Sequence, residues 1–380
     1  MADSGTSLKG VKVLIASGGT GGHFYPGWVL GKAVRAEGGE VLFVVKKNDM
    51  ALPKLESDGF AAIEIDMMGL PRAPGLDSLR FLRKFWSSMT LLGNVARAWR
   101  PRVAVGMGAY LTFPAVLTAW RFKIPAIIHE ANAVYGLANR VSAPFVRKIA
   151  LGMPLQQDDN DPKTRLTGTP IRSALWSLPA VRSAREALAL DAEKRTVLVF
   201  GGSQGAHSLN RIVPEAIASA GLKYPGKIQA LHISGGESAT EIEGRYGASV
   251  RAKVLNYLER MELAYAAADL VICRAGASTL AEIIALRKPA LLIPYPLAAE
   301  QHQRLNAQLL SLAGCALMVE ERELSAGALA QTCEQLLFSN YPGRLEELRQ
   351  NFSRLHLPAP DKGLEMMLDL IRELSGGADA

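Results

Sequence analysis

The chain has 380 residues, of which 49% are hydrophobic and 21% are charged. This composition excludes an intrinsically disordered chain, and the length exceeds what one ordinary hydrophobic core supports, so two domains are expected. The sequence contains no run of about 18 apolar residues and no secretory leader, so no membrane span is expected. Its three cysteines lack the spacing of a zinc or redox motif and suit a reducing cytoplasm.

Positive charge is concentrated in the first half of the chain. Residues 1–190 contain 24 Lys and Arg against 14 Asp and Glu, whereas residues 191–380 contain 19 against 22. A basic half joined to an acidic one predicts that one domain faces a polyanion, which could be nucleic acid, an anionic lipid or a phosphorylated substrate. Composition alone does not choose among these three.

Short apolar runs alternate with helical stretches throughout the chain. In the first half, strands are predicted at 11–17, 41–46, 61–65, 103–106, 126–129 and 147–151, and a helix at about 26–37. In the second half, strands are predicted at 196–200, 227–233, 252–255, 270–273 and 290–293. Near-continuous apolar strands separated by helices are typical of a parallel sheet that is covered on both faces.

A polar stretch at about 158–195 breaks this rhythm and predicts the join between domains. We therefore expect an N-terminal domain over 1–165, a linker over 166–195 and a C-terminal domain over 196–360. A lone amphipathic helix is predicted at about 361–375, which could pack back on either domain, including the N-terminal one.

Both halves open with a similar glycine-rich segment: VKVLIASGGTGGH at 11–23 and RTVLVFGGSQGAH at 195–207. Each leads from a strand into a helix, where backbone N–H groups and the helix dipole favour an anion. The repeated segment favours an α/β fold of two Rossmann-like domains that face each other across a cleft. Nicotinamide binding is disfavoured because Phe24 replaces the third glycine of G-x-G-x-x-G, and no P-loop sequence occurs. A tight turn without a ligand is the alternative for either loop.

A basic segment lies between residues 72 and 102, with seven Lys and Arg against one acid, Asp77. Apolar and basic side chains alternate there at helical spacing, which predicts an amphipathic helix on an anionic leaflet, each charge contributing about 1 kcal/mol. The alternative is an ordinary helix with its apolar stripe in the core. The expected membrane contacts are Arg80, Leu82, Arg83, Lys84, Phe85 and Trp86.

Further segments complete an ordered pattern that resembles the MurG glycosyltransferases. They are GMGAYLTFP (106–114), HEANAVYGLANR (129–140), TGTPIR (167–172) and CRAGASTLAEIIALRKPALLIPYPLAAEQHQRLNA (273–307). The resemblance covers about residues 11–306 and implies the two-domain GT-B fold. It implies inverting transfer of N-acetylglucosamine from UDP-N-acetylglucosamine to the 4-hydroxyl of the muramyl sugar of lipid I, which forms lipid II in peptidoglycan synthesis. It also implies a peripheral protein at the cytoplasmic face of the bacterial inner membrane.

The resemblance implies a donor site that lies mainly in the C-terminal half. Glu282 is expected to bind the ribose hydroxyls, although Thr279-x-x-Glu282 also has the spacing of a helix capping box. His302 and Asn306 share a helix face and are expected to hold sugar hydroxyls with Gln303, unless they decorate a solvent face. The other implied donor contacts are Thr20, Gly21, Gly22, Asn132, Arg172, Ser203, Leu258, Ala277, Ser278 and Thr279.

The attacking hydroxyl must lose a proton, and a positioned base contributes roughly 10²–10⁴-fold to the rate. His23 is the first candidate because an imidazole titrates near neutrality; the alternative is that it hydrogen-bonds phosphate or backbone. Glu130 is the second, as a base, an orienting group or a structural residue. Tyr110 is expected to line the acceptor cleft, and His207 is interpreted as structural.

No metal ion or other cofactor is expected. The only D-x-D, at 159–161, lies in the polar join and is interpreted as a solvated loop. The resemblance implies that helix dipoles and backbone amides meet the charge of the diphosphate in place of a divalent cation. Activity should therefore survive a chelator.

The chain departs from the family pattern mostly in its first half. The departures are Ala109 for glycine, Leu111 to Phe113 for glycines, Ala131 for glutamine and Thr169 for asparagine. The competing enzymatic functions are a UDP-sugar 2-epimerase and a glycolipid glycosyltransferase of the same fold, and the competing non-enzymatic one is a UDP-sugar-binding protein. Wall-synthesis proteins are candidate partners, whereas nucleic acid is not, because no recognised binding module occurs.

Overall fold

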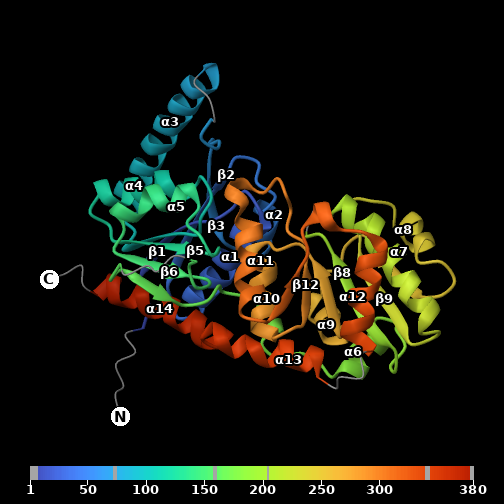
Figure 1. The fold of residues 1–380 in the computed structure, drawn as a ribbon. Helices are drawn as coiled ribbons and strands as arrows, with labels where there is room; N and C mark the ends of the chain where they lie inside the picture. The colour runs from blue at the N-terminus through green and yellow to red at the C-terminus, as the bar shows by residue number, and fades with distance from the viewer. Residues whose placement is uncertain (1–6, 72–74, 157–160, 203–204, 339–342, 377–380) are drawn as a thin grey trace, which may run out of the picture. The chain divides into compact units, whose positions relative to one another are not determined.

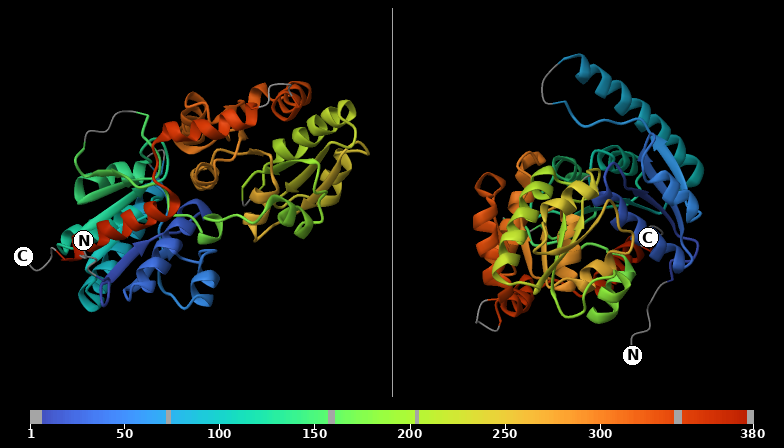
Figure 2. Two further views of the ribbon diagram at one scale, coloured as in Figure 1. Left: turned by 90° about the horizontal axis from the view of Figure 1, so that it is seen from below. Right: turned by 90° about the vertical axis from the view of Figure 1, so that its right-hand side faces the viewer.

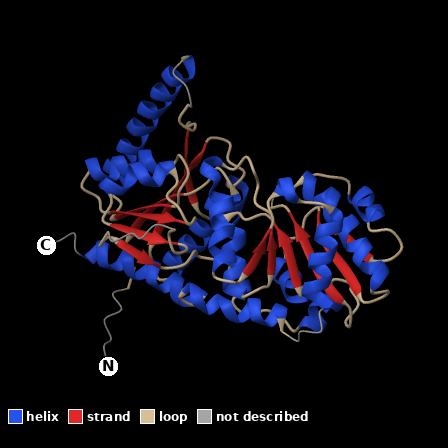
Figure 3. Cartoon of the chain, in the orientation of Figure 1, coloured by secondary structure: helices blue, strands red, loops and turns tan. Residues whose placement is uncertain are grey.

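In a computed structural model of the chain, residues 7–71, 75–156, 161–202, 205–338 and 343–376 are described (Figure 1). The chain divides into two compact units. Unit 1 comprises Met1–Arg172 and Leu357–Ala380, and unit 2 comprises Ser173–His356. Each unit is a parallel sheet with helices on its faces (Figure 3), which confirms the predicted α/β class.

Unit 1 contains a seven-stranded sheet in the order β3-β2-β1-β4-β5-β6-β7. The strands are β1 (Lys12–Ala16), β2 (Glu40–Lys46), β3 (Ala61–Ile65), β4 (Val103–Gly106), β5 (Ala126–Glu130), β6 (Lys148–Leu151) and β7 (Thr164–Leu166). The order reverses between β1 and β4, and parallel sheets of this kind bind ligands beyond the carboxyl ends of the strands at such a reversal. The segments that follow β1, β4 and β5 are therefore the first place to look for a site.

Helices cover both faces of this sheet because its strands are apolar on both sides. Along β1, Val13 and Ile15 belong to one core cluster, and Leu14 and Ala16 belong to the other. The helices of unit 1 are α1 (Gly21–Ala36), α2 (Leu52–Ser57), α3 (Leu76–Trp99), α4 (Thr112–Arg121), α5 (Leu137–Ser142), a 3-10 turn (Ala143–Phe145) and α14 (Pro360–Gly376).

The terminal helix α14 is part of unit 1 (Figure 2). Its residues Leu364, Met367 and Ile371 are buried in the same core cluster as β1 and α1. The Arg372 guanidinium forms ion pairs with Glu37 of α1 and with two carboxylates of α14 itself. Residues far apart in the sequence therefore build one core, which places α14 on the N-terminal unit.

Unit 2 contains a six-stranded sheet in the order β10-β9-β8-β11-β12-β13. The strands are β8 (Arg195–Phe200), β9 (Ile228–Ile233), β10 (Arg251–Leu255), β11 (Leu270–Cys273), β12 (Ala290–Leu292) and β13 (Ala316–Met318). The helices are α6 (Val181–Ala187), α7 (His207–Lys223), α8 (Ala239–Arg245), α9 (Met261–Ala267), α10 (Ala277–Leu286), α11 (His302–Leu312), α12 (Ala326–Phe338) and α13 (Arg344–Asn351). Short 3-10 turns occur at Ser173–Leu175, Ala299–Gln301, Glu321–Glu323 and Phe352–Leu355.

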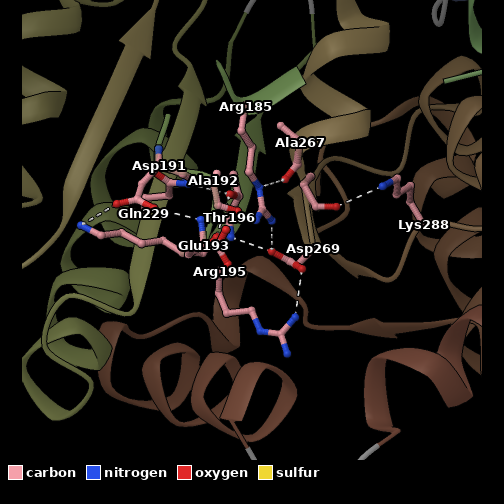
Figure 4. A network of polar contacts seen from close by, with 12 residues as sticks. Arg185, Asp191, Ala192, Glu193, Arg195, Thr196, Gln229, Ala267, Asp269 and Lys288 are labelled. Atoms are coloured by element: carbon pink, nitrogen blue, oxygen red, sulfur yellow. Dashed lines mark hydrogen bonds and ion pairs between the residues drawn. The ribbon is translucent and has the colours of Figure 1, made fainter. Parts of the chain in front are cut away.

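Helix α6 lies within the segment predicted as a linker, yet it docks on unit 2 through a buried ion pair (Figure 4). Arg185 donates to Asp269 at 2.7 Å and to the carbonyl oxygens of Ala192 and Ala267 at 2.7 and 3.1 Å. Asp269 also accepts from Arg195 and from the Thr196 amide, at the start of β8. This network ties α6 to the amino ends of β8 and β11, so the carboxyl ends of the same strands remain available for a site.

None of the described helices combines the length and the apolar character that crossing a membrane requires.

Candidate functional site

The first glycine loop joins β1 to α1 in unit 1. Gly19 has a φ of +80°, and its amide donates to the Asp49 carboxylate at 2.7 Å. A Cβ atom on Gly18 would lie 2.7 Å from the same carboxylate oxygen, so a larger residue does not fit there. Asp49 is only 6% exposed and follows β2, the neighbour of β1. Asp49 was not predicted as a site residue, and its position in the short segment after β2, the neighbour of β1, was the available signal.

His23 lies in the first turn of α1, and two neighbours hold its ring. Thr20 Oγ1 is 2.9 Å from His23 Nδ1. Gly108, at φ +92° after β4, packs so closely that a Cβ atom there would lie 2.7 Å from His23 Cδ2 and 3.0 Å from Nε2. His23 is therefore placed at the reversal of strand order, between the segments that follow β1 and β4.

Glu130, the last residue of β5, is 2% exposed and accepts four hydrogen bonds. One carboxylate oxygen accepts from the backbone and side-chain N–H groups of Asn132 at 3.0 and 2.9 Å. The other accepts from the Gly136 amide at 2.9 Å and from Asn139 Nδ2 at 2.8 Å. Glu130 therefore holds the segment that follows β5 in one conformation. Asn139, which also donates to the His129 carbonyl oxygen at 2.9 Å, was not predicted.

Two more polar side chains of unit 1 border this region. His129 is buried, and burial lowers its pKa to about 4, so its ring is neutral at pH 7. Its Nε2 lies 3.2 Å from the Gly168 carbonyl oxygen, which links β5 to the TGTP segment. The Tyr110 hydroxyl lies 3.4 Å from the position a Cβ atom on Gly19 would occupy. Burial, and then the charge of Asp49, raise the Tyr110 pKa, so its hydroxyl stays protonated.

The departures from the family pattern are mostly accommodated in the core. Ala109 adopts a φ of +58°, a left-handed conformation that an L-residue enters at a cost and that glycine enters freely. Leu111 is fully buried, and the Phe113 ring stacks on Phe85 with 5.6 Å between centroids. Thr169 Oγ1 is buried and has no hydrogen-bond partner among the described residues.

The second glycine loop joins β8 to α7 in unit 2. Gly202 and Gly205 have φ values of +94° and +75°, and the Gly205 amide donates to the Gly202 carbonyl oxygen at 3.0 Å. A Cβ atom on Gly201 would lie 2.4 Å from the Ala206 nitrogen, and one on Gly205 would lie 2.4 Å from the Ser234 carbonyl oxygen. Only glycine fits at these two positions. Ser203 lies outside the described residues.

Helix α10 begins one turn earlier than the capping-box interpretation requires. Its N-cap is Gly276, and the Leu280 amide already donates to the Gly276 carbonyl oxygen, so Thr279 lies inside the first turn. The capping-box interpretation of Glu282 is therefore wrong. Helix geometry leaves the amides of Ala277, Ser278 and Thr279 without an intrahelical acceptor. The Glu282 carboxylate is half-buried and accepts from the Tyr265 hydroxyl at 2.8 Å, a partner that was not predicted.

Helix α11 carries the three residues predicted to hold sugar hydroxyls. Asn306 is fully buried and donates to the Ala275 carbonyl oxygen at 3.3 Å, so it does not decorate a solvent face. The Gln303 side-chain oxygen accepts from the Tyr295 amide at 2.9 Å. His302 Nδ1 is buried and has no hydrogen-bond partner among the described residues. Asn306 thus ties α11 to the segment that precedes α10, and His302 retains an unused polar atom.

The remaining predicted site residues are dispersed. Leu258 is half-buried in the segment after β10, and the Arg172 guanidinium lies 5.8 Å from the centre of the Tyr25 ring. Gly21 and Gly22 form the start of α1. His207, the first residue of α7, is exposed and pairs with Glu237 at 3.3 Å.

The described residues contain no cluster of His, Cys, Asp and Glu that could hold a metal ion. Asp159 and Asn160 of the D-x-D segment lie outside the described residues.

The first half of α3 carries exposed apolar side chains and stands clear of the sheet of unit 1 (Figures 1 and 2). Leu79 and Leu82 are exposed, and Trp86 is 64% exposed. Phe85, in contrast, is buried against Phe81 and Phe113, so its predicted role as a membrane contact is wrong. Lys84 pairs with Asp66 at 2.7 Å and Arg80 pairs with Asp77 at 3.0 Å, and both Arg80 and Arg83 are exposed beside the apolar face.

Family models cover most of both units. Residues 13–151 match the N-terminal domain of glycosyltransferase family 28, and residues 196–353 match its C-terminal domain. The first match contains the glycine loop of unit 1 and the HEAN segment, and the second contains the glycine loop of unit 2, α10 and α11.

Relatives match the chain over nearly its full length. The chain is 37% identical to a UDP-N-acetylglucosamine–N-acetylmuramyl-(pentapeptide) pyrophosphoryl-undecaprenol N-acetylglucosamine transferase of Elusimicrobium minutum, over 96% of this chain and 99% of the relative. It is 36% identical to a protein of the same name from an Anaeromyxobacter species, over 96% of this chain and 95% of the relative. The crystal structure of Acinetobacter baumannii MurG is similar to it with a TM-score of 0.78 and 25% identity, covering 96% of this chain and 99% of that one.

Proposed function

This chain belongs to the MurG group of glycosyltransferase family 28, and we propose that it forms lipid II by transferring N-acetylglucosamine from UDP-N-acetylglucosamine to the muramyl 4-hydroxyl of lipid I. The observation that carries this proposal is the full-length similarity to transferases named for that donor and acceptor. The two glycine loops and the GT-B fold support it. The product is a precursor of peptidoglycan, so the activity contributes to wall growth, cell shape and division.

We place the donor mainly on unit 2. Glu282, whose carboxylate is oriented by the Tyr265 hydroxyl, would accept from the ribose hydroxyls. The first amides of α10 and the loop at 201–206 would bind the diphosphate, because a helix N-terminus with unbonded N–H groups favours an anion. The remaining proposed donor contacts are Leu258 to uracil, Ser203 to phosphate, His302, Gln303 and Asn306 to the sugar, and Thr20, Gly21, Gly22, Asn132 and Arg172 from unit 1.

We place the base and the acceptor on unit 1. With its proton on Nδ1, directed at Thr20 Oγ1, His23 carries its lone pair on Nε2. That nitrogen would take the proton of the muramyl 4-hydroxyl while the oxygen bonds to the anomeric carbon. UDP leaves from the opposite face, so the configuration inverts. Tyr110, held protonated, would donate a hydrogen bond to the acceptor.

Glu130 fits a positioning role better than that of a base. All four of its hydrogen bonds come from N–H groups of the 132–139 segment, so both carboxylate oxygens are engaged in holding that segment. We therefore assign proton removal to His23 and assign to Glu130 the orientation of Asn132.

The function is tested by transfer of radiolabelled N-acetylglucosamine from its UDP donor to a short-chain lipid I analogue. We expect the disaccharide-lipid product, and we expect the rate to persist in EDTA because the proposed diphosphate site consists of amides and a helix dipole. Loss of activity in EDTA with recovery in magnesium would contradict the metal-free site. Epimerised UDP-sugar formed without acceptor would identify an epimerase, and UDP-sugar binding without either product would identify a binding protein.

We further propose that the first half of α3 attaches the protein to the cytoplasmic face of the inner membrane. The surface consists of Leu76, Leu79, Leu82 and Trp86, which are exposed on the helix, with Arg80 and Arg83 beside them. Such a helix binds an anionic leaflet through buried apolar area and through its charges. A lipid-linked acceptor requires the enzyme to work at that surface.

Neutralising both charges, as Arg80→Gln with Arg83→Gln, should weaken binding to vesicles of anionic phospholipid about 30-fold. The reason is that each charge near an anionic surface contributes about 1 kcal/mol, and two such charges correspond to about that factor. Vesicle sedimentation measures the affinity, with Arg97→Gln as the matched control, because Arg97 is an exposed arginine near the other end of α3. Binding that ignores the anionic lipid content, or an equal effect of the control, would refute the proposed surface.

A further inference from the structure

A chain of buried polar side chains runs through unit 2 behind the second glycine loop. The Tyr246 hydroxyl lies 2.9 Å from His232 Nδ1, and His232 Nε2 lies 2.9 Å from Asn210 Oδ1. Asn210 Nδ2 then donates to the Ser234 carbonyl oxygen at 3.0 Å. All four residues are almost completely buried. Buried polar groups are costly unless they are paired, so this chain needs an explanation beyond filling space.

The hydrogen-bond directions in this chain are determined from its Ser234 end. Because a carbonyl oxygen only accepts, the Asn210 amide nitrogen must face Ser234, and its oxygen must face His232. His232 Nε2 therefore carries the proton, and Nδ1 accepts from the Tyr246 hydroxyl. Burial lowers the His232 pKa to about 4 and raises the Tyr246 pKa, which keeps both groups neutral. A single arrangement of protons therefore satisfies all three hydrogen bonds that link Tyr246, His232, Asn210 and Ser234.

The chain ends directly beneath the glycine loop. A Cβ atom on Gly205 would lie only 2.4 Å from the Ser234 carbonyl oxygen, so the Gly205 backbone packs directly against that carbonyl group. The glycine loop leads into α7, where the backbone N–H group of Asn210 donates to the Ala206 carbonyl oxygen at 2.9 Å. A shift of Asn210 would therefore move both the Ala206 backbone and the Ser234 carbonyl group, because Asn210 is hydrogen-bonded to each.

We propose that His232 is a positioning residue for the donor diphosphate, acting through Asn210 and the Ser234 carbonyl group to fix the backbone of Gly205 and Ala206 at the end of the second glycine loop. This inference rests on the proposed function, because that function makes the loop a diphosphate site. The uridine and the ribose are assigned to other segments, at Leu258 and Glu282. Disturbing this series of hydrogen bonds should therefore weaken binding of the diphosphate and leave binding of the nucleoside unchanged.

The test compares the affinities of UDP and uridine, measured by calorimetry, in wild type and Tyr246→Phe. Removing the hydroxyl leaves His232 Nδ1 buried without a donor, and the ring would repack and shift Asn210 with it. We expect UDP to bind about tenfold more weakly and uridine to bind as before. Tyr224→Phe is the matched control, because it removes the same atom from a tyrosine of unit 2 that stacks on Phe338.

A second pair of variants keeps the test sharp if Tyr246→Phe is only marginally stable. His232→Gln retains one donor and one acceptor and should keep most of the preference for UDP, whereas His232→Leu should lose it. If the thermal midpoint falls and the UDP-to-uridine affinity ratio stays constant in Tyr246→Phe and His232→Leu, the residue is merely structural and the inference is overturned. If wild type itself binds UDP no more tightly than uridine, the proposed diphosphate site is overturned first.

Discussion

Replacing His23 with alanine should lower kcat for transfer by roughly 10²–10⁴-fold while leaving UDP affinity within about threefold of wild type. The imidazole that this variant removes lies at the reversal of strand order in unit 1, where it contacts the Gly108 backbone and the Thr20 hydroxyl. Its loss removes the proton acceptor but none of the proposed diphosphate amides of unit 2. Single-turnover transfer and calorimetric UDP binding measure the two effects separately.

The pH profile of kcat provides the second readout for His23. Wild type should lose activity on the acid side as the imidazole is protonated, and the residual activity of His23→Ala should lack that limb. His356→Asn is the matched control, because His356 is exposed with a φ of +51° that asparagine tolerates. A His23→Ala enzyme that keeps more than about a tenth of wild-type kcat would rule out His23 as the base.

The fold was predictable wherever apolar periodicity was strong. Every strand predicted from an apolar run is present, because such runs are long enough to be told from turns. Strands β7 and β13 were missed, since each has only three residues and pairs at a sheet edge. Helix α6 was assigned to a linker because its docking depends on Arg185 reaching Asp269, 84 residues away. No local pattern encodes such a contact.

The site residues that lie in a recognisable loop motif could be predicted from the sequence. The positions of His23 and Glu130 follow from motifs at the ends of predicted strands, and the structure places His23 after β1 and Glu130 at the carboxyl end of β5. Asp49 and Tyr265 were missed because their partners lie 30 and 17 residues away in the sequence, whereas Asn139 was missed although it lies in the same 129–140 segment as its partner Glu130. The spacing of Thr279 and Glu282 was misleading, since the glycine before Ala277 starts α10 earlier. Spacing alone does not determine where a helix begins.

Replacing Glu130 with glutamine should lower the free energy of unfolding by about 2–6 kcal/mol. Each carboxylate oxygen accepts two hydrogen bonds, so whichever oxygen becomes an NH₂ group faces two donors. Those two bonds are lost in a site that is 2% exposed, at about 1–3 kcal/mol each. Urea unfolding measures the loss, with Glu64→Gln as the control, because that exposed carboxylate of β3 accepts one hydrogen bond from the Asn48 amide.

The same variant separates the two roles considered for Glu130. If Glu130 positions Asn132 and the 132–139 segment, kcat should fall together with stability, while the acid limb that belongs to His23 persists. If Glu130 were the base, kcat would fall by the full 10²–10⁴-fold of a lost general base, and the acid limb would disappear. Four N–H donors aimed at one buried carboxylate favour the first result, because both of its oxygens are engaged in holding the 132–139 segment.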